Sequence, residues 1–322
     1  MKQLLFFTLS LCLVLSACAS STTTVGRDLA TVPPSPPSVP LPAATAPAVP
    51  MPDSPFNYDA SVPFDTKVVS ETDRGGVTVV DLTYATHDPN FSTTTGGRTI
   101  AYLVKPQGQG PFAGVIYLHW LGTVSGSRTE YLDDAVALAR HGVISLLLQG
   151  YFPWMSFPMG NQNDHQLMLG QVIELRRAVD FLLTQPGVDP QRLGYVGHDY
   201  GALYGGVLAG IDHRIKTYVL IAGTPSFADF GALFGFPREK YLPVVHDLDP
   251  DQYVPKAAPA SLFFQFGEND GIVPKDVATR YFDAASEPKK IEWYADIHDM
   301  RNDLASQARL QWLTDQLKLQ TP

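Results

Sequence analysis

The chain from about residue 76 onward alternates short apolar runs with longer amphipathic stretches, and this order constrains the fold most. Two early runs, 76–86 and 98–107, alternate apolar and polar residues as half-buried strands do. The later runs are almost continuously apolar, which is typical of strands buried on both faces of a sheet. They span residues 112–120, 143–150, 192–199, 215–223, 260–267 and 290–296. Helical patterns lie between them, so the chain predicts an α/β fold: a mostly parallel central sheet with helices on both faces.

Composition excludes one class of partner. The 322 residues include 45% hydrophobic and 17% charged residues, which is enough apolar material for one large domain. The formal net charge is -9, and no run of Lys and Arg is present. Because nucleic-acid phosphates require a basic surface, we expect no nucleic-acid partner.

The N-terminus has the pattern of an export signal. Lys2 precedes an apolar run that is too short for a comfortable membrane span and ends in small residues, so residues 1–17 are predicted to be a signal peptide. The sequence Leu15-Ser16-Ala17-Cys18 resembles the lipobox of bacterial lipoprotein precursors. The resemblance implies cleavage before Cys18, lipidation of that residue, and a protein anchored in the bacterial cell envelope, on the outer membrane or facing the periplasm. The alternative is an ordinary signal peptide.

Both cysteines of the chain, Cys12 and Cys18, lie in this segment, so the exported body has no thiol for a disulfide. Residues 18–64 are rich in Pro, Ala, Ser and Thr and lack apolar periodicity, and we expect them to form a disordered tether. Residues 65–322 are then the folded domain.

One motif lies where a predicted buried strand meets a predicted helix. Gly197-His198-Asp199-Tyr200-Gly201 fits the Gly-x-nucleophile-x-Gly elbow, in which glycines relieve crowding around a strained turn. The central residue is Asp199 instead of serine. By this motif Asp199 is the candidate nucleophile, whereas His198 is expected to face the sheet as a structural residue.

An acid and a histidine follow the later strands. Asp270 comes just after the run 260–267, and His298 comes after the last run. Nucleophile, acid and histidine in this chain order, each at the carboxyl end of a strand, is the order of the α/β-hydrolase fold. Three other acids compete for the role of Asp270: Glu268, Asp296 and Asp299.

The run VDPQRLGYVGHDYGALYGG, with LHWLG upstream and FGENDGIVP downstream, resembles the dienelactone-hydrolase-like branch of the α/β-hydrolase superfamily. The resemblance covers nearly all of the exported domain. The elbow itself is more similar to the GHDxG turn of epoxide hydrolases and haloalkane dehalogenases, in which aspartate is the nucleophile. The resemblance implies an oxyanion hole made by the backbone N–H groups of Leu121 and Tyr200. Trp120 stands where the branch usually has glycine.

Trp120 and Tyr151 are candidates for the wall of the substrate pocket. The segment between Gly223 and Ala260 is too short for a large helical cap, so we expect only a small lid. Cap-domain tyrosines, which open the ring in epoxide hydrolases, are therefore missing. Three tyrosines could replace them, although each is more typical of a core or pocket wall: Tyr151, Tyr204 and Tyr241. No metal-ligand spacing is present, and no cofactor is expected.

An aspartate nucleophile favours particular substrates. A carboxylate is ionised at neutral pH, so Asp199 can attack an alkyl carbon without a base, and His298 is then available to activate water. The chain is thus predicted to hydrolyse a small epoxide or halide through the residues Asp199, His298 and Asp270. One alternative is an esterase or lactonase of the dienelactone-hydrolase type, in which Asp199 acts as a base. Another is a noncatalytic, envelope-anchored binding protein that retains the hydrolase fold.

Overall fold

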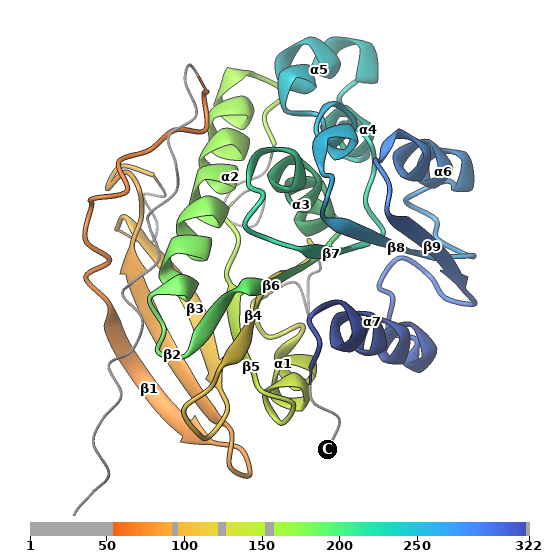
Figure 1. Ribbon diagram of the computed structural model, residues 1–322. Helices are drawn as coiled ribbons and strands as arrows, with labels where there is room; N and C mark the ends of the chain where they lie inside the picture. Colours follow the sequence, from red (N-terminus) through yellow and green to blue (C-terminus); the bar gives the residue numbers. More distant parts are fainter. Residues whose placement is uncertain (1–53, 92–95, 122–126, 152–157, 320–322) are drawn as a thin grey trace, which may run out of the picture. The chain divides into compact units, whose positions relative to one another are not determined.

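The central sheet has the predicted α/β arrangement. The computed structural model describes residues 54–91, 96–121, 127–151 and 158–319, all within one compact unit of the chain. Over these residues nine strands form one sheet in the order β1-β2-β3-β5-β4-β6-β7-β8-β9 (Figure 1). Their bounds are β1 Lys67–Asp73, β2 Thr78–Ala85, β3 Arg98–Lys105, β4 Phe112–Leu118, β5 Val143–Leu148, β6 Val188–His198, β7 Thr217–Ile221, β8 Ser261–Gly267 and β9 Lys289–Tyr294.

Strand direction divides the sheet into two parts. The strands β4, β5, β6, β7, β8 and β9 run parallel. The strands β1, β2 and β3 extend the sheet as an antiparallel edge. Each predicted run overlaps a strand, but β1 lies outside all of them. Every residue of β1 is exposed, so the strand is stabilised by its ladder with β2 and leaves no apolar pattern in the sequence.

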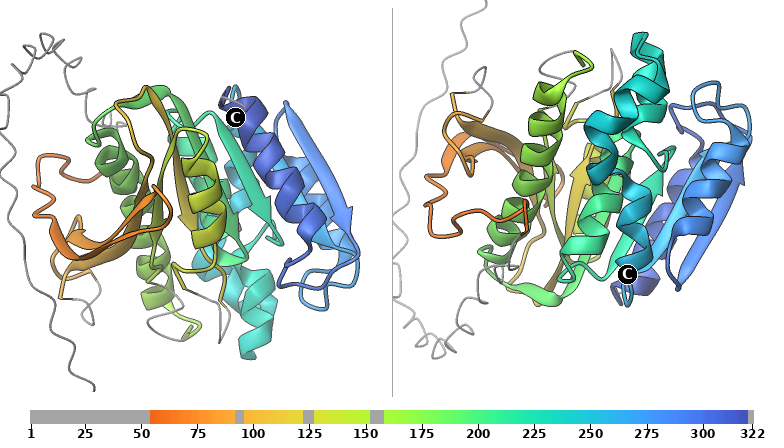
Figure 2. Two further views of the ribbon diagram at one scale, coloured as in Figure 1. Left: turned by 90° about the horizontal axis from the view of Figure 1, so that it is seen from below. Right: turned by 90° about the horizontal axis from the view of Figure 1, so that it is seen from above.

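Helices cover both faces of the sheet (Figure 2). Their bounds are α1 Leu132–Ala139, α2 Gln162–Leu183, α3 Tyr200–Ile211, α4 Phe227–Gly231, α5 Arg238–Val245, α6 Lys275–Ala284 and α7 Asp303–Gln316. Buried residues of α2, α3 and α6 form one core with the sheet, while α1 and α7 pack in a second core on the other face. The fully buried patterns of β4, β5, β7 and β8 follow from this double cover.

The residues before β1 correct the expected start of the domain. Phe56 is only 2% exposed, and its carbonyl oxygen accepts a hydrogen bond from Arg176 Nη1 at 2.7 Å. The ring of Phe64 packs edge-on against Phe181, with 5.2 Å between the ring centroids. Residues 54–64 therefore pack against the body instead of belonging to the tether. Residues 1–53, with Cys18 and most of the expected tether, lie outside the described residues.

The segment between β7 and β8 is a small lid, as expected. It contains α4, α5 and four short 3₁₀ turns: Ala232–Phe234, His246–Leu248, Pro250–Gln252 and Val254–Lys256. In Figure 1, α4 and α5 lie on the same side of the sheet as α3.

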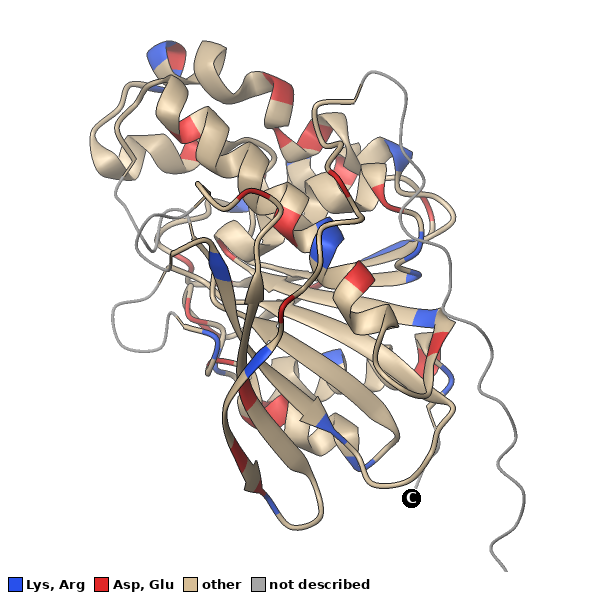
Figure 3. Cartoon of the chain, turned by 90° about the vertical axis from the view of Figure 1, so that its left-hand side faces the viewer, with Lys and Arg blue, Asp and Glu red and all other residues tan. Residues whose placement is uncertain are grey.

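Charge is distributed over many elements. In Figure 3, acidic and basic residues are interspersed along the ribbon, and no single described element carries a basic surface. None of the helices in the described ranges is both long and apolar enough for a transmembrane span.

Candidate active site

Asp199 lies at a strained turn between β6 and α3. Its backbone φ is 55°, a conformation that is costly for a residue with a side chain. The flanking glycines make the turn possible, because a Cβ atom at Gly197 would lie 2.2 Å from the carbonyl oxygen of Gly201. A Cβ atom at Gly201 would lie 2.3 Å from the carbonyl oxygen of Leu118. The motif therefore forms the sharp elbow expected from the sequence, with Asp199 at its tip.

The predicted acid and histidine lie beside the elbow. His298 Nδ1 is 2.9 Å from Asp270 Oδ2, and His298 Nε2 is 3.9 Å from Asp199 Oδ1. Asp270 is fixed by two backbone N–H groups, from Ile272 and Val273, which donate to its Oδ1 at 2.7 and 2.9 Å. The Asp270 carboxylate thereby orients the imidazole of His298 toward Asp199.

Electrostatics favour a charged His298 in the substrate-free protein. Burial disfavours the imidazolium, but the carboxylates of Asp199 and Asp270 outweigh burial and raise the pKa of His298 to about 9. Burial alone would raise the pKa of Asp270. The hydrogen bonds from His298 and from the backbone outweigh burial and hold that pKa below its usual value. At neutral pH the three side chains form a carboxylate, imidazolium and carboxylate.

The competing acids are engaged elsewhere. Asp296 accepts hydrogen bonds from the backbone N–H groups of Ile297 and Asn302. Asp299 lies 3.5 Å from the guanidinium of Arg301, and Glu268 is exposed. Asp270 is thus the acid that contacts the histidine.

The two carboxylate oxygens of Asp199 have different surroundings. Oδ2 accepts a hydrogen bond from the backbone N–H of Leu121 at 3.1 Å. Oδ1 faces His298, and no hydrogen bond from the described residues reaches it. Tyr200 begins α3 directly after Asp199, so its N–H lies at the helix N-terminus, where negative charge is stabilised. Of the two backbone groups predicted to form the oxyanion hole, Leu121 N–H thus binds the Asp199 carboxylate, and Tyr200 N–H lies in the first turn of α3.

The loop after β4 is anchored by His119. The Nδ1 atom of His119 is 2.9 Å from the carbonyl oxygen of Trp120, and Nε2 accepts from the N–H of Gly150 at 3.1 Å. Burial lowers the pKa of His119 to about 4, which keeps the ring neutral for this donor and acceptor pattern. The guanidinium of Arg128, later in the same loop, forms a two-bond ion pair with Asp81 on β2.

Trp120 lies at the site, and a glutamate unforeseen from the sequence lies next to it. The indole of Trp120 stacks on the ring of His198, with 5.3 Å between centroids and an angle of 15°. Its centroid is 5.7 Å from that of His298. Glu130 Oε1 is 2.7 Å from His198 Nδ1, and Glu130 Oε2 accepts from the N–H of Trp120 at 3.0 Å. Glu130 lies just before α1 in a stretch that is simply helical and polar in sequence, so only the fold reveals its contacts.

The candidate tyrosines have structural contacts. Tyr151, expected at the pocket wall, directs its hydroxyl to the carbonyl oxygen of Arg98 at 2.7 Å. Tyr241 donates to Asp164 Oδ2 at 2.8 Å, and the ring of Tyr204 packs on Phe227. The hydroxyls of Tyr151 and Tyr241 thus make structural hydrogen bonds, and the place of Tyr151 in the pocket wall stays a prediction.

Aromatic rings surround the catalytic side chains instead. Phe230, on α4 of the lid, lies edge-on to His298 with 6.3 Å between centroids. The same ring stacks on Tyr200 at 5.2 Å. Asp199 itself is only 4% exposed. The lid and the loop after β4 thus give the carboxylate an apolar, water-poor environment.

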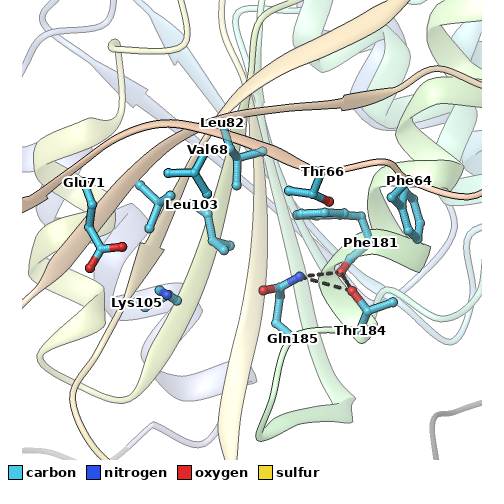
Figure 4. A pocket seen from close by; sticks show the side chains of 11 residues that line it. Phe64, Thr66, Val68, Glu71, Leu82, Leu103, Lys105, Phe181, Thr184 and Gln185 are labelled. Atoms are coloured by element: carbon cyan, nitrogen blue, oxygen red, sulfur yellow. Dashed lines mark hydrogen bonds between the residues drawn. The ribbon is translucent and has the colours of Figure 1, made fainter.

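A groove of about 300 Å³ lies at a different edge of the sheet (Figure 4). It is lined by residues of β1, β2 and β3 and by the end of α2, with Leu82, Leu103 and Phe181 at its apolar side. Gln185, which precedes β6, also lines it, so the groove lies toward the amino end of β6, whereas Asp199 follows the carboxyl end. Across the described residues no cluster of three or more His, Cys, Asp or Glu has the arrangement of a metal site.

Sequence comparison finds distant relatives of part of the chain. No protein-family model matches it. A Mycobacterium tuberculosis protein of uncharacterised function is 30% identical over 169 residues, which is 52% of this chain and 56% of that protein. The peroxisomal succinyl-coenzyme A thioesterase of Mus musculus is 30% identical over 128 residues, 40% of this chain and 28% of the mouse protein. The chain thus matches about half the length, or less, of these curated relatives.

Solved structures match over most of the chain. An acetyl xylan esterase from Paenibacillus sp. R4 superimposes with a TM-score of 0.64 at 14% identity, covering 79% of this chain and 89% of the esterase. Acetyl xylan esterase 1 from Thermoanaerobacterium sp. JW/SL YS485 gives a TM-score of 0.60 at 15% identity, covering 80% and 90%. At such low identity the likeness establishes the fold. The chain has the α/β-hydrolase fold, and these two structural neighbours are esterases.

Proposed function

We propose that the chain is a hydrolase in which Asp199 is the nucleophile and attacks an alkyl carbon of a small epoxide or halide substrate. The observation that carries this proposal is the asymmetry of the Asp199 carboxylate. Oδ2 accepts the N–H of Leu121, while Oδ1 faces His298 without a hydrogen bond from the described residues. One oxygen is therefore available to attack, and the other already lies where an oxyanion would be stabilised.

In the first step Oδ1 of Asp199 forms a bond to the substrate carbon, and the bond from that carbon to the halogen or the epoxide oxygen breaks with its electron pair. A halide departs as the anion, whereas the opened epoxide oxygen stays on the substrate and takes up a proton from water. The attack removes no proton, so His298 can be protonated during it. The product of this step is an ester between the substrate carbon and Asp199. Its carbonyl oxygen is Oδ2, which remains at the N–H of Leu121.

The first step prepares the base for the second. Forming the ester removes the negative charge of Asp199, one of the two carboxylates that raise the pKa of His298. The pKa of His298 then falls, and the imidazole can release its proton and accept one from water. Hydroxide attacks the Asp199 carbonyl carbon, the N–H of Leu121 stabilises negative charge on Oδ2, and the alcohol product leaves. Asp270 stabilises the imidazolium that forms.

The surroundings favour an apolar substrate. The rings of Phe230 and Trp120 lie near His298, and the ring of Tyr200, the residue after Asp199, stacks on Phe230. A burial of this kind increases the nucleophilicity of the carboxylate by limiting its contact with water. Haloalkanes and aromatic or aliphatic epoxides fit this environment better than charged molecules.

Ester hydrolysis is the second candidate, and the similar proteins favour it. Both acetyl xylan esterases and the mouse thioesterase are named for cleaving acyl groups. In this chain such a reaction would use Asp199 as a base for water, because an aspartyl nucleophile on an ester carbonyl expels its own carboxylate more readily than an alkoxide. The bond from Leu121 to Oδ2 weighs against this candidate, since the substrate oxyanion needs that donor.

The two candidates differ in whether Asp199 becomes covalently modified. A panel of epoxides, haloalkanes and p-nitrophenyl esters first identifies a substrate that the purified protein turns over. We expect the variant His298→Gln to form the Asp199 ester but not to hydrolyse it, so intact mass should rise by the mass of the attached substrate. His87→Gln is the matched control, because His87 is paired with Glu174, on α2, instead of with the groups of the elbow.

The outcome separates all three hypotheses. An adduct on Asp199 supports the nucleophile. Turnover of an ester by the unmodified protein, with no adduct in a folded His298→Gln variant, supports the base. A folded protein that turns over no member of the panel leaves the noncatalytic binding protein as the remaining hypothesis.

We also propose that the chain is lipidated at Cys18 and anchored in the cell envelope. The support is the lipobox-like sequence before Cys18 and the proline-rich segment that follows it. Metabolic labelling with a fatty-acid analogue should label the expressed full chain and not the variant Cys18→Ala. Equal labelling of both chains would contradict the proposal.

A further inference from the structure

His198 connects the two loops that carry the proposed chemistry. Its Nδ1 is 2.7 Å from Glu130 Oε1, and its Nε2 is 2.8 Å from the carbonyl oxygen of His298. The other oxygen of Glu130 accepts the N–H of Trp120 at 3.0 Å. A continuous chain of hydrogen bonds thus runs from the loop after β4 to the loop after β9.

We propose that Glu130 and His198 form a positioning pair, which fixes the N–H donor of Leu121 and the imidazole of His298 on opposite sides of Asp199. This inference rests on the proposed function of those groups. Glu130 fixes the residue that precedes Leu121, and His198 fixes the backbone of His298 itself. Neither residue of the pair touches the reacting atoms.

The hydrogen-bond partners of His198 and Glu130 indicate where the protons of the pair lie. The carbonyl oxygen of His298 can only accept, so His198 Nε2 must carry a proton. Glu130 uses both oxygens as acceptors, since Oε2 receives the N–H of Trp120 and Oε1 faces His198 Nδ1. A second proton therefore lies between Nδ1 and Oε1. The buried ring of His198 and the partly exposed carboxyl group of Glu130 share this proton in a charge-assisted hydrogen bond.

Stacking completes the arrangement. The indole of Trp120 lies parallel to His198 and is also near His298, so the three rings pack together. His198 is fully buried, and its side chain cannot rotate without breaking two hydrogen bonds and the stack. This gives the Trp120 side chain a structural role, because its ring packs on His198. The N–H that Glu130 binds belongs to the Trp120 backbone.

The chain contains a natural control for this pair. Glu174 is as buried as a core residue, and its Oε1 lies 2.5 Å from His87 Nδ1 while its Oε2 accepts from Thr99 at 2.8 Å. The chemistry matches that of Glu130 and His198, but these bonds connect α2 with β3 and the residues after β2. Losing Glu174 should cost stability without moving His298.

Glu130→Leu and Glu174→Leu are the matched variants, and Glu130→Gln is the conservative one. Glutamine at 130 can still accept the N–H of Trp120 and donate to Nδ1 of a neutral His198, so it retains every contact of the positioning role. The primary readout is the pKa of His298 from an NMR titration of labelled histidine rings, which requires no substrate.

We expect Glu130→Leu to lower the His298 pKa by about one unit or more, because the imidazole loses its alignment with Asp199 and Asp270. Glu130→Gln should restore most of the shift, and Glu174→Leu should leave it unchanged. In a turnover assay Glu130→Leu should lower kcat about 10- to 100-fold with little change in KM. An unchanged His298 pKa in folded Glu130→Leu, or an equal change in Glu174→Leu, would overturn the proposal.

A measurement on the unsubstituted protein avoids dependence on folding of the variants. The ring ¹⁵N signals of His198 should show both nitrogens protonated, with a downfield Nδ1–H proton that Glu130→Gln removes. A His198 ring with one protonated nitrogen in the unsubstituted protein contradicts the pair. Because these spectra need no substrate, failure of the proposed alkyl-carbon chemistry leaves this test intact.

Discussion

The loops after β4 and β9 each bury a histidine near Asp199, but the pKa values of the two rings differ by about five. His119 is 1% exposed and bonds to backbone and amide groups, and its pKa is lowered to about 4. His298 is 6% exposed and faces two carboxylates, and its pKa is raised to about 9. Burial is similar in the two loops, so the charge of the partners determines the difference.

The difference separates a fixed anchor from a proton carrier. A ring that stays neutral over the physiological pH range maintains one pattern of donor and acceptor, which suits the loop that positions Leu121. A ring whose pKa depends on the charge of Asp199 changes protonation when that charge is removed. The site therefore combines a loop that is insensitive to the reaction with a loop that responds to it.

The largest expected effect comes from removing the charge of Asp199. Asp199→Asn retains the shape of the side chain but cannot act as a nucleophile, and we expect turnover to fall by about 10⁴-fold or more. The pKa of His298 should fall, because one of the two carboxylates that raise it is gone. NMR titration of both histidines measures this, with His119 as the internal control. A His298 pKa that stays near 9 in Asp199→Asn would contradict the claim that the charge of the partners sets the difference between the two histidines.

The next effect is a loss of stability at alkaline pH. The pKa of His298 is higher in the folded protein, about 9, than the ordinary 6.5, so protonation favours folding. This contribution is fully present below pH 6.5 and is lost as pH rises through 9, a decrease of roughly 3 kcal/mol in the free energy of unfolding. Urea unfolding at several pH values should show the decrease in the unsubstituted protein and a much weaker one in His298→Gln.

The smallest effect is on the acid side and belongs to the other loop. The pKa of His119 is lower in the folded protein, so its contribution is present above pH 6.5 and is lost as pH falls toward 4. Between pH 6.5 and 5, before most carboxylates titrate, this amounts to about 2 kcal/mol. His119→Gln should lose this dependence while retaining the alkaline one. If His119→Gln removed the alkaline dependence as well, the two loops would not be independent.

Sequence patterns predicted the parts of the fold that depend on burial. The apolar runs identified the strands from β2 to β9, and small residues around Asp199 identified the elbow, because Gly197 and Gly201 have no room for a Cβ atom. The strand β1 was missed because it is exposed on both faces. Residues 54–64 were misassigned to the tether because Phe56 and Phe64, which pack against the body, stand apart in a proline-rich segment and make no periodic signal.

The sequence predicted the site residues that follow strand ends, but it did not predict the contacts between different segments of the chain. The order of Asp199, Asp270 and His298 follows strand ends, which the sequence marks. The contact of Glu130 with His198 joins segments 68 residues apart in sequence, and no local pattern encodes it or the contact with Trp120. The hydrogen bond from the Tyr151 hydroxyl to the carbonyl oxygen of Arg98 on β3 is likewise a contact that no local pattern predicts.

A single turnover in ¹⁸O-labelled water tests the central claim most directly. The unsubstituted protein is mixed, in excess, with an epoxide or haloalkane that it turns over, and the peptide containing Asp199 and the product are analysed by mass spectrometry. If Asp199 is the nucleophile, the product takes its oxygen from the carboxylate, and the labelled oxygen from water enters Asp199. Label in the product of the first turnover, with none in Asp199, would contradict the account and make Asp199 a base.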